Sequence, residues 1–490
     1  MDRRHFIEAG LGLGALALAG NARADQETRR RFHAALEHDP ALAVYADTVG
    51  SQAGEASLSG RLPADLQGSF YRNGPGRFEL GGERYHHWFD GDGFAQRWTI
   101  AGGKVRHQGR FVETRRYLDE TQAGQFLYPS FGTWVARRGF RDNDSLNAAN
   151  TNLLPFNGRV YALWEGGSAI EVDPETLATK GIKTWRDDLR AMPFSAHPKC
   201  DPAGGMWNFG ALPGSGRIAL YQIGADGQVL RTALIDVPGQ AMVHDFVVSA
   251  RHLIFLVPPY DLKPGKDMSF VERHAWAGSG PAARPLRAVV VAKDSLTMRH
   301  VFELPPRMVF HFGNAWEDGA CTRFDAVLHE GDVLGELGDL MAGARQTRSR
   351  SEAVQICLDH AAGQARISRL FGASEFPRVA PQTVGSRHRK LVLLGGDALL
   401  NSVNLVDTDS GKVDAYRFDA GWQVEEHVLV PRNNARSETD GYLVGVAQDL
   451  RRGIGVLCVF DAARVSAGPL ALARLPYRTP HCFHGNFLSA

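Results

Sequence analysis

Short apolar stretches separated by turn residues recur along the chain from about Leu62 onward. Runs rich in β-branched and aromatic residues, bounded by Gly, Pro, Asp and Asn, predict β-strands. The strands we expect are 159–164, 217–223, 252–257, 288–291, 390–394, 441–447 and 455–460. Turn-forming sequences occupy 172–176, 292–296 and 406–412, and Gly102 with Gly103 predicts a hairpin. The pattern therefore indicates an all-β protein.

Helical periodicity is scarce in this sequence. It occurs at 26–36, at 334–342 and, more weakly, at 130–138, and these are the helices we expect. The β-rich region has neither an evident fixed-period repeat nor a Gly/Ser- or Pro-rich linker. It therefore favours one large closed sandwich, barrel or propeller. Residues 340–352 are expected to form a basic, solvated surface loop.

Composition and charge narrow the functional classes. The chain has 490 residues, a formal net charge of +1 and 44% hydrophobic residues, enough for a sizeable core. A nearly neutral chain without a basic stripe argues against nucleic acid as a partner. Its five cysteines are far apart and form no Cys-x-x-Cys pair, which argues against a disulfide framework or a zinc–thiolate site.

The N-terminus has the organisation of an export signal. Arg3 and Arg4 precede an apolar run over 9–20, and 22–24 matches a small-x-small cleavage site. The paired arginines resemble a bacterial twin-arginine signal, with an ordinary secretory signal as the alternative. We expect residues 1–24 to be this signal, recognised by the twin-arginine export machinery, and the mature protein to be periplasmic. A short extension over 25–60 then precedes a single domain over 61–490.

Four histidines lie in distinctive apolar or aromatic settings: His197, His244, His311 and His484. A histidine with such flanks is commonly half-buried and bonded to one backbone group. Together, however, the four suggest one metal bound by imidazoles from distant parts of the chain. Neutral imidazole suits iron, copper, zinc and nickel.

Several motifs in a fixed order give these histidines a context. They occupy 68–76, 85–93, 149–152, 197–199, 244–246, 310–317, 374–378, 430–432 and 483–485. In this series the sequence resembles the carotenoid cleavage oxygenases, from about residue 60 to the C-terminus. The resemblance implies a seven-bladed β-propeller, with short helices and loops capping the active-site face. It also implies one ferrous iron on the propeller axis, bound by His197, His244, His311 and His484.

The same resemblance places three glutamates around the metal ligands, at Glu165, Glu375 and Glu426. A carboxylate that accepts the second ring N–H of a metal-bound histidine fixes its tautomer and raises its basicity. Glu425 is a rival for Glu426, but the spacing to 431–432 favours Glu426. The sequence departs from the family at the next position, where His427 replaces the usual proline, and this puts the local backbone in question.

The implied reaction is a dioxygenase cleavage in which O2 and a conjugated C=C bond give two carbonyl products. Such chemistry requires no general base, and the sequence contains no recognisable Ser-His-Asp arrangement. Ser195, although close to His197, is not expected to be a nucleophile. His86 and His87 match no ligand motif and are expected to be structural, in a tight turn between strands.

The substrate is expected to be an apolar carotenoid or apocarotenoid. A related branch cleaves stilbenes and typically has a lysine in its pocket, but 124–140 contains Arg137 and Arg138 and no lysine. A retinoid isomerase-like activity is a further alternative. A periplasmic ligand-binding propeller with a structural metal is the non-enzymatic one.

Two apolar segments could deliver such a substrate from a membrane. Residues 125–134 are aromatic, and 257–270 combine apolar side chains with Lys263 and Lys266. This composition suits peripheral contact with anionic lipid, and an ordinary covering loop is the alternative.

Overall fold

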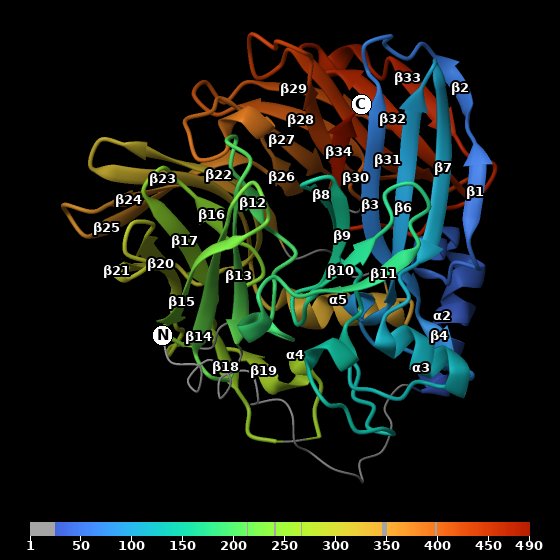
Figure 1. Cartoon of the computed structure of the whole chain (residues 1–490), viewed down its shortest axis with the longest axis horizontal. Helices are drawn as coiled ribbons and strands as arrows, with labels where there is room; N and C mark the ends of the chain where they lie inside the picture. The colour runs from blue at the N-terminus through green and yellow to red at the C-terminus, as the bar shows by residue number, and fades with distance from the viewer. Residues whose placement is uncertain (1–24, 213, 240–241, 266, 345–349, 397–398) are drawn as a thin grey trace.

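Seven β-sheets surround a central axis in the computed structural model (Figure 1). The structure describes residues 25–490 except 213, 240–241, 266, 345–349 and 397–398. The expected export signal over 1–24 and most of the basic part of the 340–352 loop therefore lie outside the described residues. The predicted all-β, seven-bladed propeller is confirmed.

Each of these sheets is one antiparallel blade, in which each strand is hydrogen-bonded to the next one named. The first two blades are β1 (Gln52–Glu55), β7 (Lys104–Phe111), β6 (Asp92–Ala101), β3 (Gly68–Arg77) and β34 (His484–Ser489), then β8 (Asn152–Phe156), β9 (Arg159–Leu163), β10 (Ala169–Val172) and β11 (Thr179–Lys183). The third and fourth are β12 (Lys199–Cys200), β13 (Met206–Leu212), β14 (Arg217–Ile223) and β15 (Val229–Asp236), then β16 (Val247–Val248), β17 (His252–Val257), β20 (Leu286–Ala292) and β21 (Met298–Leu304).

The remaining three blades are built in the same way. The fifth and sixth are β22 (Met308–Asp318), β23 (Cys321–His329), β24 (Ser351–Asp359) and β25 (Gln364–Phe371), then β26 (Ser374–Arg378), β27 (Lys390–Gly395), β28 (Ser402–Asp407) and β29 (Val413–Arg417). The seventh is β30 (Trp422–Pro431), β31 (Gly441–Asp449), β32 (Ile454–Asp461), β33 (Ala471–Arg474) and β2 (Ser57–Gly60). Six of the seven predicted strands lie within these elements, the seventh, 159–164, runs one residue beyond β9, and Gly102 and Gly103 connect β6 to β7 as expected.

The two ends of the strand-forming chain close the ring. The C-terminal strand β34 pairs with β3 of the first blade, with Asn73 opposite His484. The N-terminal strand β2 pairs with β33 at the outer edge of the seventh blade. A cluster that includes Phe70, Trp98, Val444 and Leu457 is buried between these two blades. Closure therefore combines backbone pairing with burial of apolar surface between the first and last blades.

Helices gather at one side of the ring, in the lower part of Figure 1. They are α2 (Gln26–His38), α3 (Arg115–Ala123), α4 (Phe270–Arg273) and α5 (Val333–Met341). The predicted helices over 26–36 and 334–342 are confirmed as α2 and α5. None of the described helices has both the length and the apolar character needed to span a membrane.

The helix predicted over 130–138 is wrong, because this segment is an irregular loop. The Gly132 N–H and the Thr133 hydroxyl donate to the two oxygens of the Asp90 carboxylate, at 2.7 and 2.6 Å. The polar groups of Gly132 and Thr133 are therefore bonded to a distant residue and not within a helix. Pro129 directly before it and Gly132 within it also disfavour helix formation.

Gly445 on β31 gives a test of packing in the seventh blade. Its partner across the pair is His427, and a Cβ at Gly445 would lie 2.2 Å from the His427 Nδ1. Gly445→Ala should therefore lower the free energy of unfolding by about 1–3 kcal/mol through overpacking. Denaturant unfolding measures this, with Gly139→Ala as control, because a Cβ there meets nothing within 4 Å. Equal stability of the two variants would contradict the close packing of His427 over Gly445.

Candidate metal centre

The structure brings His197, His244, His311 and His484 together on the axis. His197 lies two residues before the inner strand β12 and His244 three residues before β16, whereas His311 lies in β22 and His484 begins β34. Successive Nε2 atoms are separated by 2.9 Å (197 to 244), 3.3 Å (244 to 311) and 3.1 Å (311 to 484). The four potential ligand atoms all lie within 4.8 Å of one another, close enough to bind one metal ion.

The inner strands are irregular at His311 and at two of the glutamates, Glu375 and Glu426. The β22–β23 register shifts between Val309 and Phe312, at His311. The β26–β27 register shifts directly after Glu375, and the β30–β31 register shifts between Val424 and His427. An irregularity of this kind interrupts the strict alternation of a strand and can re-aim a side chain.

Three of the four imidazoles have a glutamate on the ring nitrogen that faces away from the axis. The Nδ1-to-carboxylate distances are 3.1 Å for His244 and Glu165, 2.7 Å for His311 and Glu375, and 3.0 Å for His484 and Glu426. A neutral imidazole that donates Nδ1–H to a carboxylate presents its Nε2 lone pair to a metal. The arrangement therefore selects the tautomer that metal binding needs.

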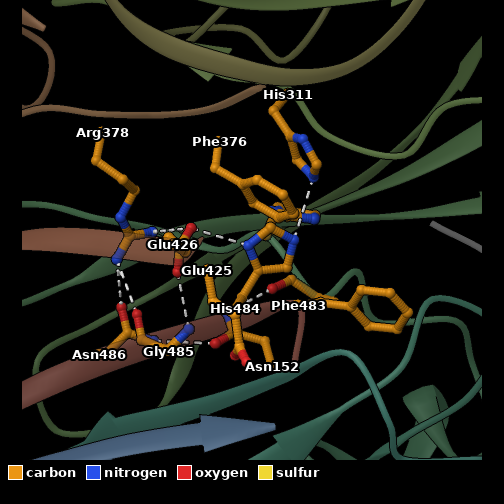
Figure 2. A network of polar contacts seen from close by, with 12 residues as sticks. Asn152, His311, Phe376, Arg378, Glu425, Glu426, Phe483, His484, Gly485 and Asn486 are labelled. Carbon is orange, nitrogen blue, oxygen red and sulfur yellow. Dashed lines mark hydrogen bonds and ion pairs between the residues drawn. The ribbon is translucent and has the colours of Figure 1, made fainter. Parts of the chain in front are cut away.

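The two neighbouring glutamates on β30 have different partners, and Figure 2 shows those of Glu426. Glu426 accepts from His484 Nδ1 and from the Gly485 N–H, at 3.0 and 2.9 Å. Glu425 forms a buried ion pair with Arg72 at 2.9 Å and accepts from the Gln448 amide at 2.7 Å. Only Glu426 contacts an imidazole of the axial cluster, whereas Glu425 joins β30 to the first blade.

His427, the residue that departs from the family pattern, is fully buried. Its Nδ1 lies 2.7 Å from the Glu425 carbonyl oxygen, and its ring packs over Gly445. Burial lowers the pKa of His427 to about 4, so the ring is neutral near pH 7. The backbone of β30 is irregular here, because its register with β31 shifts between Val424 and His427.

Sequence reasoning missed His329, a further histidine near the centre. Its Nε2 lies 2.7 Å from Glu375 Oε1, so Glu375 joins His311 to His329. Phe376, next along the chain, has φ of +56° and stacks on the His311 ring at a centroid distance of 5.2 Å. No motif marked His329. It lies at the end of β23 in the fifth blade and contacts Glu375 of the sixth blade only in the folded propeller.

Burial and charge set the protonation states that a metal requires. Burial lowers the pKa of His197 well below its usual value, and lowers that of His484 to about 4 although Glu426 opposes the shift. Burial alone would raise the pKa of Glu375 and of Glu426. The contacts of Glu375 with His311 and His329, and of Glu426 with Arg378 and His484, outweigh burial and hold the pKa of each carboxyl below its usual value. Neutral imidazoles backed by ionised carboxylates are a donor set that fits a divalent ion.

A cavity of about 930 Å³ reaches the histidine cluster. Its wall is rich in aromatic side chains: Trp88, Phe89, Phe131, Trp134, Phe140, Trp164, Phe270, Phe310, Phe376 and Phe483. The two predicted entrance segments, 125–134 and 257–270, both contribute to this wall. Lys263 is exposed, whereas Lys266 lies outside the described residues. Contact with a membrane stays a prediction.

The other residues considered from the sequence have structural contacts. His87 caps a short 3-10 turn and its Nε2 lies 3.1 Å from the Leu334 carbonyl oxygen, whereas His86 lies 3.6 Å from the Asp25 carboxylate. Ser195 accepts from the His197 N–H and donates to the His244 carbonyl oxygen, at 3.1 and 3.3 Å. Ser195 therefore connects the backbones of two of the clustered histidines.

Comparison with known proteins places this arrangement in a family. The model for the retinal pigment epithelial membrane protein family matches residues 46–489. The chain belongs to this family. It is 31% identical over 466 residues to the apocarotenoid-15,15'-oxygenase of Synechocystis sp., an alignment covering 88% of this chain and 92% of the relative. The predicted family membership is confirmed.

Other relatives carry different substrates in their names. Lignostilbene-alpha,beta-dioxygenase isozyme III of Sphingomonas paucimobilis is 27% identical over 478 residues, covering 89% of this chain and 94% of the relative. A solved structure of a Synechocystis apocarotenoid oxygenase variant superposes with a TM-score of 0.85 at 26% identity, covering 92% of this chain and 98% of that one. The chain is therefore similar in sequence to relatives named for different substrates, and similar in fold to the apocarotenoid oxygenase.

His311→Ala should abolish specific binding of a divalent metal. The change removes the imidazole that lies between His244 and His484, and leaves Glu375 without its partner on the axis. Metal content after loading with ferrous iron, together with turnover, measures the effect. Stoichiometric metal and full turnover in this variant would remove His311 from the ligand set.

Glu426→Gln and Glu425→Gln form a matched pair on adjacent positions. Glu426→Gln should fold and lose about 10-fold or more in metal affinity, because its carboxylate contacts the His484 ring. Glu425→Gln should instead lower the free energy of unfolding by about 3–5 kcal/mol, because Arg72 is left buried without its counter-charge. Metal titration and denaturant unfolding of both variants separate the two roles, and equal affinities would contradict the role of Glu426.

Proposed function

We propose that this protein is a non-haem iron(II) dioxygenase that cleaves a conjugated C=C bond of a carotenoid or apocarotenoid into two carbonyl products. The observation that carries the proposal is the group of four converging imidazoles, three of them paired with glutamates, at the end of an aromatic cavity. Membership of the family and the named activities of its relatives support the reaction class.

His197, His244, His311 and His484 would bind the metal, one ion per chain. Ferrous iron, when bound there, supplies a reducing centre and open coordination positions that allow O2 to react with an alkene. Neutral donors suit iron, but they suit other late transition metals as well. A cobalt-substituted structure of the Synechocystis relative exists, with a TM-score of 0.84. Cobalt is therefore a reasonable spectroscopic substitute for iron in binding experiments on this chain.

The protein's own contribution is to orient the alkene and exclude water. The aromatic wall suits a long apolar polyene, and its volume of about 930 Å³ lies within the range of small-molecule sites. The glutamates hold the imidazoles in one orientation and offset the charge of a buried dication. Ser195 is not needed as a nucleophile in this scheme, and its hydroxyl is already hydrogen-bonded to backbone groups.

The cavity composition favours a polyene over a phenolic stilbene. The described cavity wall contains no lysine, and neither Arg137 nor Arg138 belongs to it. Arg137 instead pairs with Glu83 at 2.7 Å, and Arg138 lies 3.4 Å from Asp119. A phenol would therefore lack the lysine contact expected in the stilbene branch.

A product screen tests the proposed function. The chain from Asp25, loaded with ferrous iron, is incubated in air with β-carotene, apocarotenals and hydroxystilbenes, and the products are identified by mass spectrometry. We expect aldehydes from a polyene, whose masses locate the cleaved bond. Benzaldehydes from stilbenes alone would overturn the carotenoid assignment.

Metal identity separates the enzyme from the non-enzymatic alternative. Ferrous iron that gives a nitric oxide signal in electron paramagnetic resonance would support the dioxygenase. Native zinc without oxygen-dependent turnover would support a ligand-binding propeller. Verified iron with no cleavage of any compound would favour isomerase or binding activity over the proposed cleavage.

We also propose that the protein is exported to the periplasm by the twin-arginine route. The support is the sequence over 1–24, which lies outside the described residues. Replacing Arg3 and Arg4 by lysine should retain the full-length precursor in the cytoplasm. Fractionation of cells expressing the full chain measures this, with the unaltered signal as control, and unchanged export would contradict the route.

A further inference from the structure

Asp245 is a buried carboxylate beside the cluster; it lies within the motif at 244–246, but the site described so far gives it no role. Its side chain is 2% exposed and follows His244 directly in the sequence. His197, the one imidazole without a glutamate at Nδ1 among the described residues, has its Nδ1 4.0 Å from Asp245 Oδ1. That separation is too long for a direct hydrogen bond.

The Asp245 carboxylate instead binds the backbone around the ligands. Oδ1 accepts from the Phe246 N–H at 2.7 Å, and Oδ2 accepts from the Phe312 N–H at 3.0 Å. Phe312 follows His311 on β22, the inner edge strand of the fifth blade. An edge strand leaves N–H groups without partners in its own sheet, and a buried N–H needs an acceptor. Asp245 supplies that acceptor from the fourth blade.

Lys199 links the same carboxylate to the third blade. Its Nζ lies 2.7 Å from Asp245 Oδ1, and Lys199 is two residues beyond His197, on β12. The ammonium also lies 5.9 Å from the centre of the Phe246 ring. A buried carboxylate is costly without a counter-charge, so the lysine compensates Asp245 while tying the segment of His197 to it.

We propose that Asp245, ion-paired with Lys199, is a positioning residue that fixes the segments of His197, His244 and His311 relative to one another. Glu426 makes a comparable bridge elsewhere, because it binds both the His484 ring and the Gly485 N–H. Asp245 links three ligand segments on three blades, through the backbone N–H groups of Phe246 and Phe312 and through the Lys199 side chain. The inference rests on the proposed metal centre but not on the identity of the alkene.

Asp245→Asn removes the charge with little change in size. We expect this variant to fold and to bind Co(II) about 10-fold or more weakly than the wild type, with a changed Co(II) absorption spectrum. The matched control is Asp92→Asn, because Asp92 is also buried and ion-paired, with Arg77 at 2.7 Å, but contacts none of the four histidines. Competition with a chromophoric chelator measures affinity, and thermal unfolding of the metal-free proteins measures stability.

The comparison separates positioning from general stability. A loss of affinity in Asp245→Asn that exceeds that of Asp92→Asn supports the proposal. A loss no greater than that of Asp92→Asn, or an unchanged spectrum, overturns it. Failure of the wild type to bind Co(II) would instead overturn the metal centre itself, so the two failures are distinguishable.

Lys199→Met tests the ion pair. The single variant leaves the buried Asp245 carboxylate without its counter-charge. Its metal-free form should therefore have a lower melting temperature than the metal-free double variant Lys199→Met/Asp245→Asn. Purely additive shifts in melting temperature would overturn the pairing between the two residues. If Lys199→Met and Asp245→Asn each prove too unstable to purify, the double variant still reports Co(II) affinity. A wild-type affinity in that variant would overturn the positioning role.

Discussion

Four imidazoles from four blades can meet on the axis only if the ring of blades is closed. The clustered histidines are separated by 47, 67 and 173 residues along the chain. The largest separation is bridged because β34, which begins with His484, pairs with β3 of the first blade. Closing the ring therefore also completes the candidate metal centre, and apolar burial between the first and seventh blades stabilises both.

Charge compensation is the second constraint on the centre. Buried carboxylates would be costly alone, but each of them has partners: imidazoles for Glu375 and Glu426, and Arg72 for Glu425. A divalent ion bound among neutral imidazoles would complete this balance. Irregular inner strands supply the geometry, because they turn His311 and the glutamates toward the axis without breaking the outer ladders.

The cavity that reaches the candidate metal centre is lined largely by aromatic side chains. Rings from the loop over 125–134, from α4 and from the inner strands together form an apolar wall that ends at the histidines. In the proposed function this wall would hold a conjugated hydrocarbon. The relatives of this chain are named for apocarotenoids and for lignostilbenes, so membership of the family does not by itself decide the substrate.

Local signals in the chain were enough to identify seven of the strands, helices α2 and α5, the family and the four histidines, but not α3. Alternating apolar runs specify strands, and short motifs surround His197, His244, His311 and His484. These signals could not exclude a helix over 130–138, since its loop conformation depends on the distant Asp90 carboxylate. Nor could they find His329 or the bridge from Asp245 to the backbone of Phe312. Those contacts join separate strands or blades, and buried polar groups become partners only when folding brings such distant segments together.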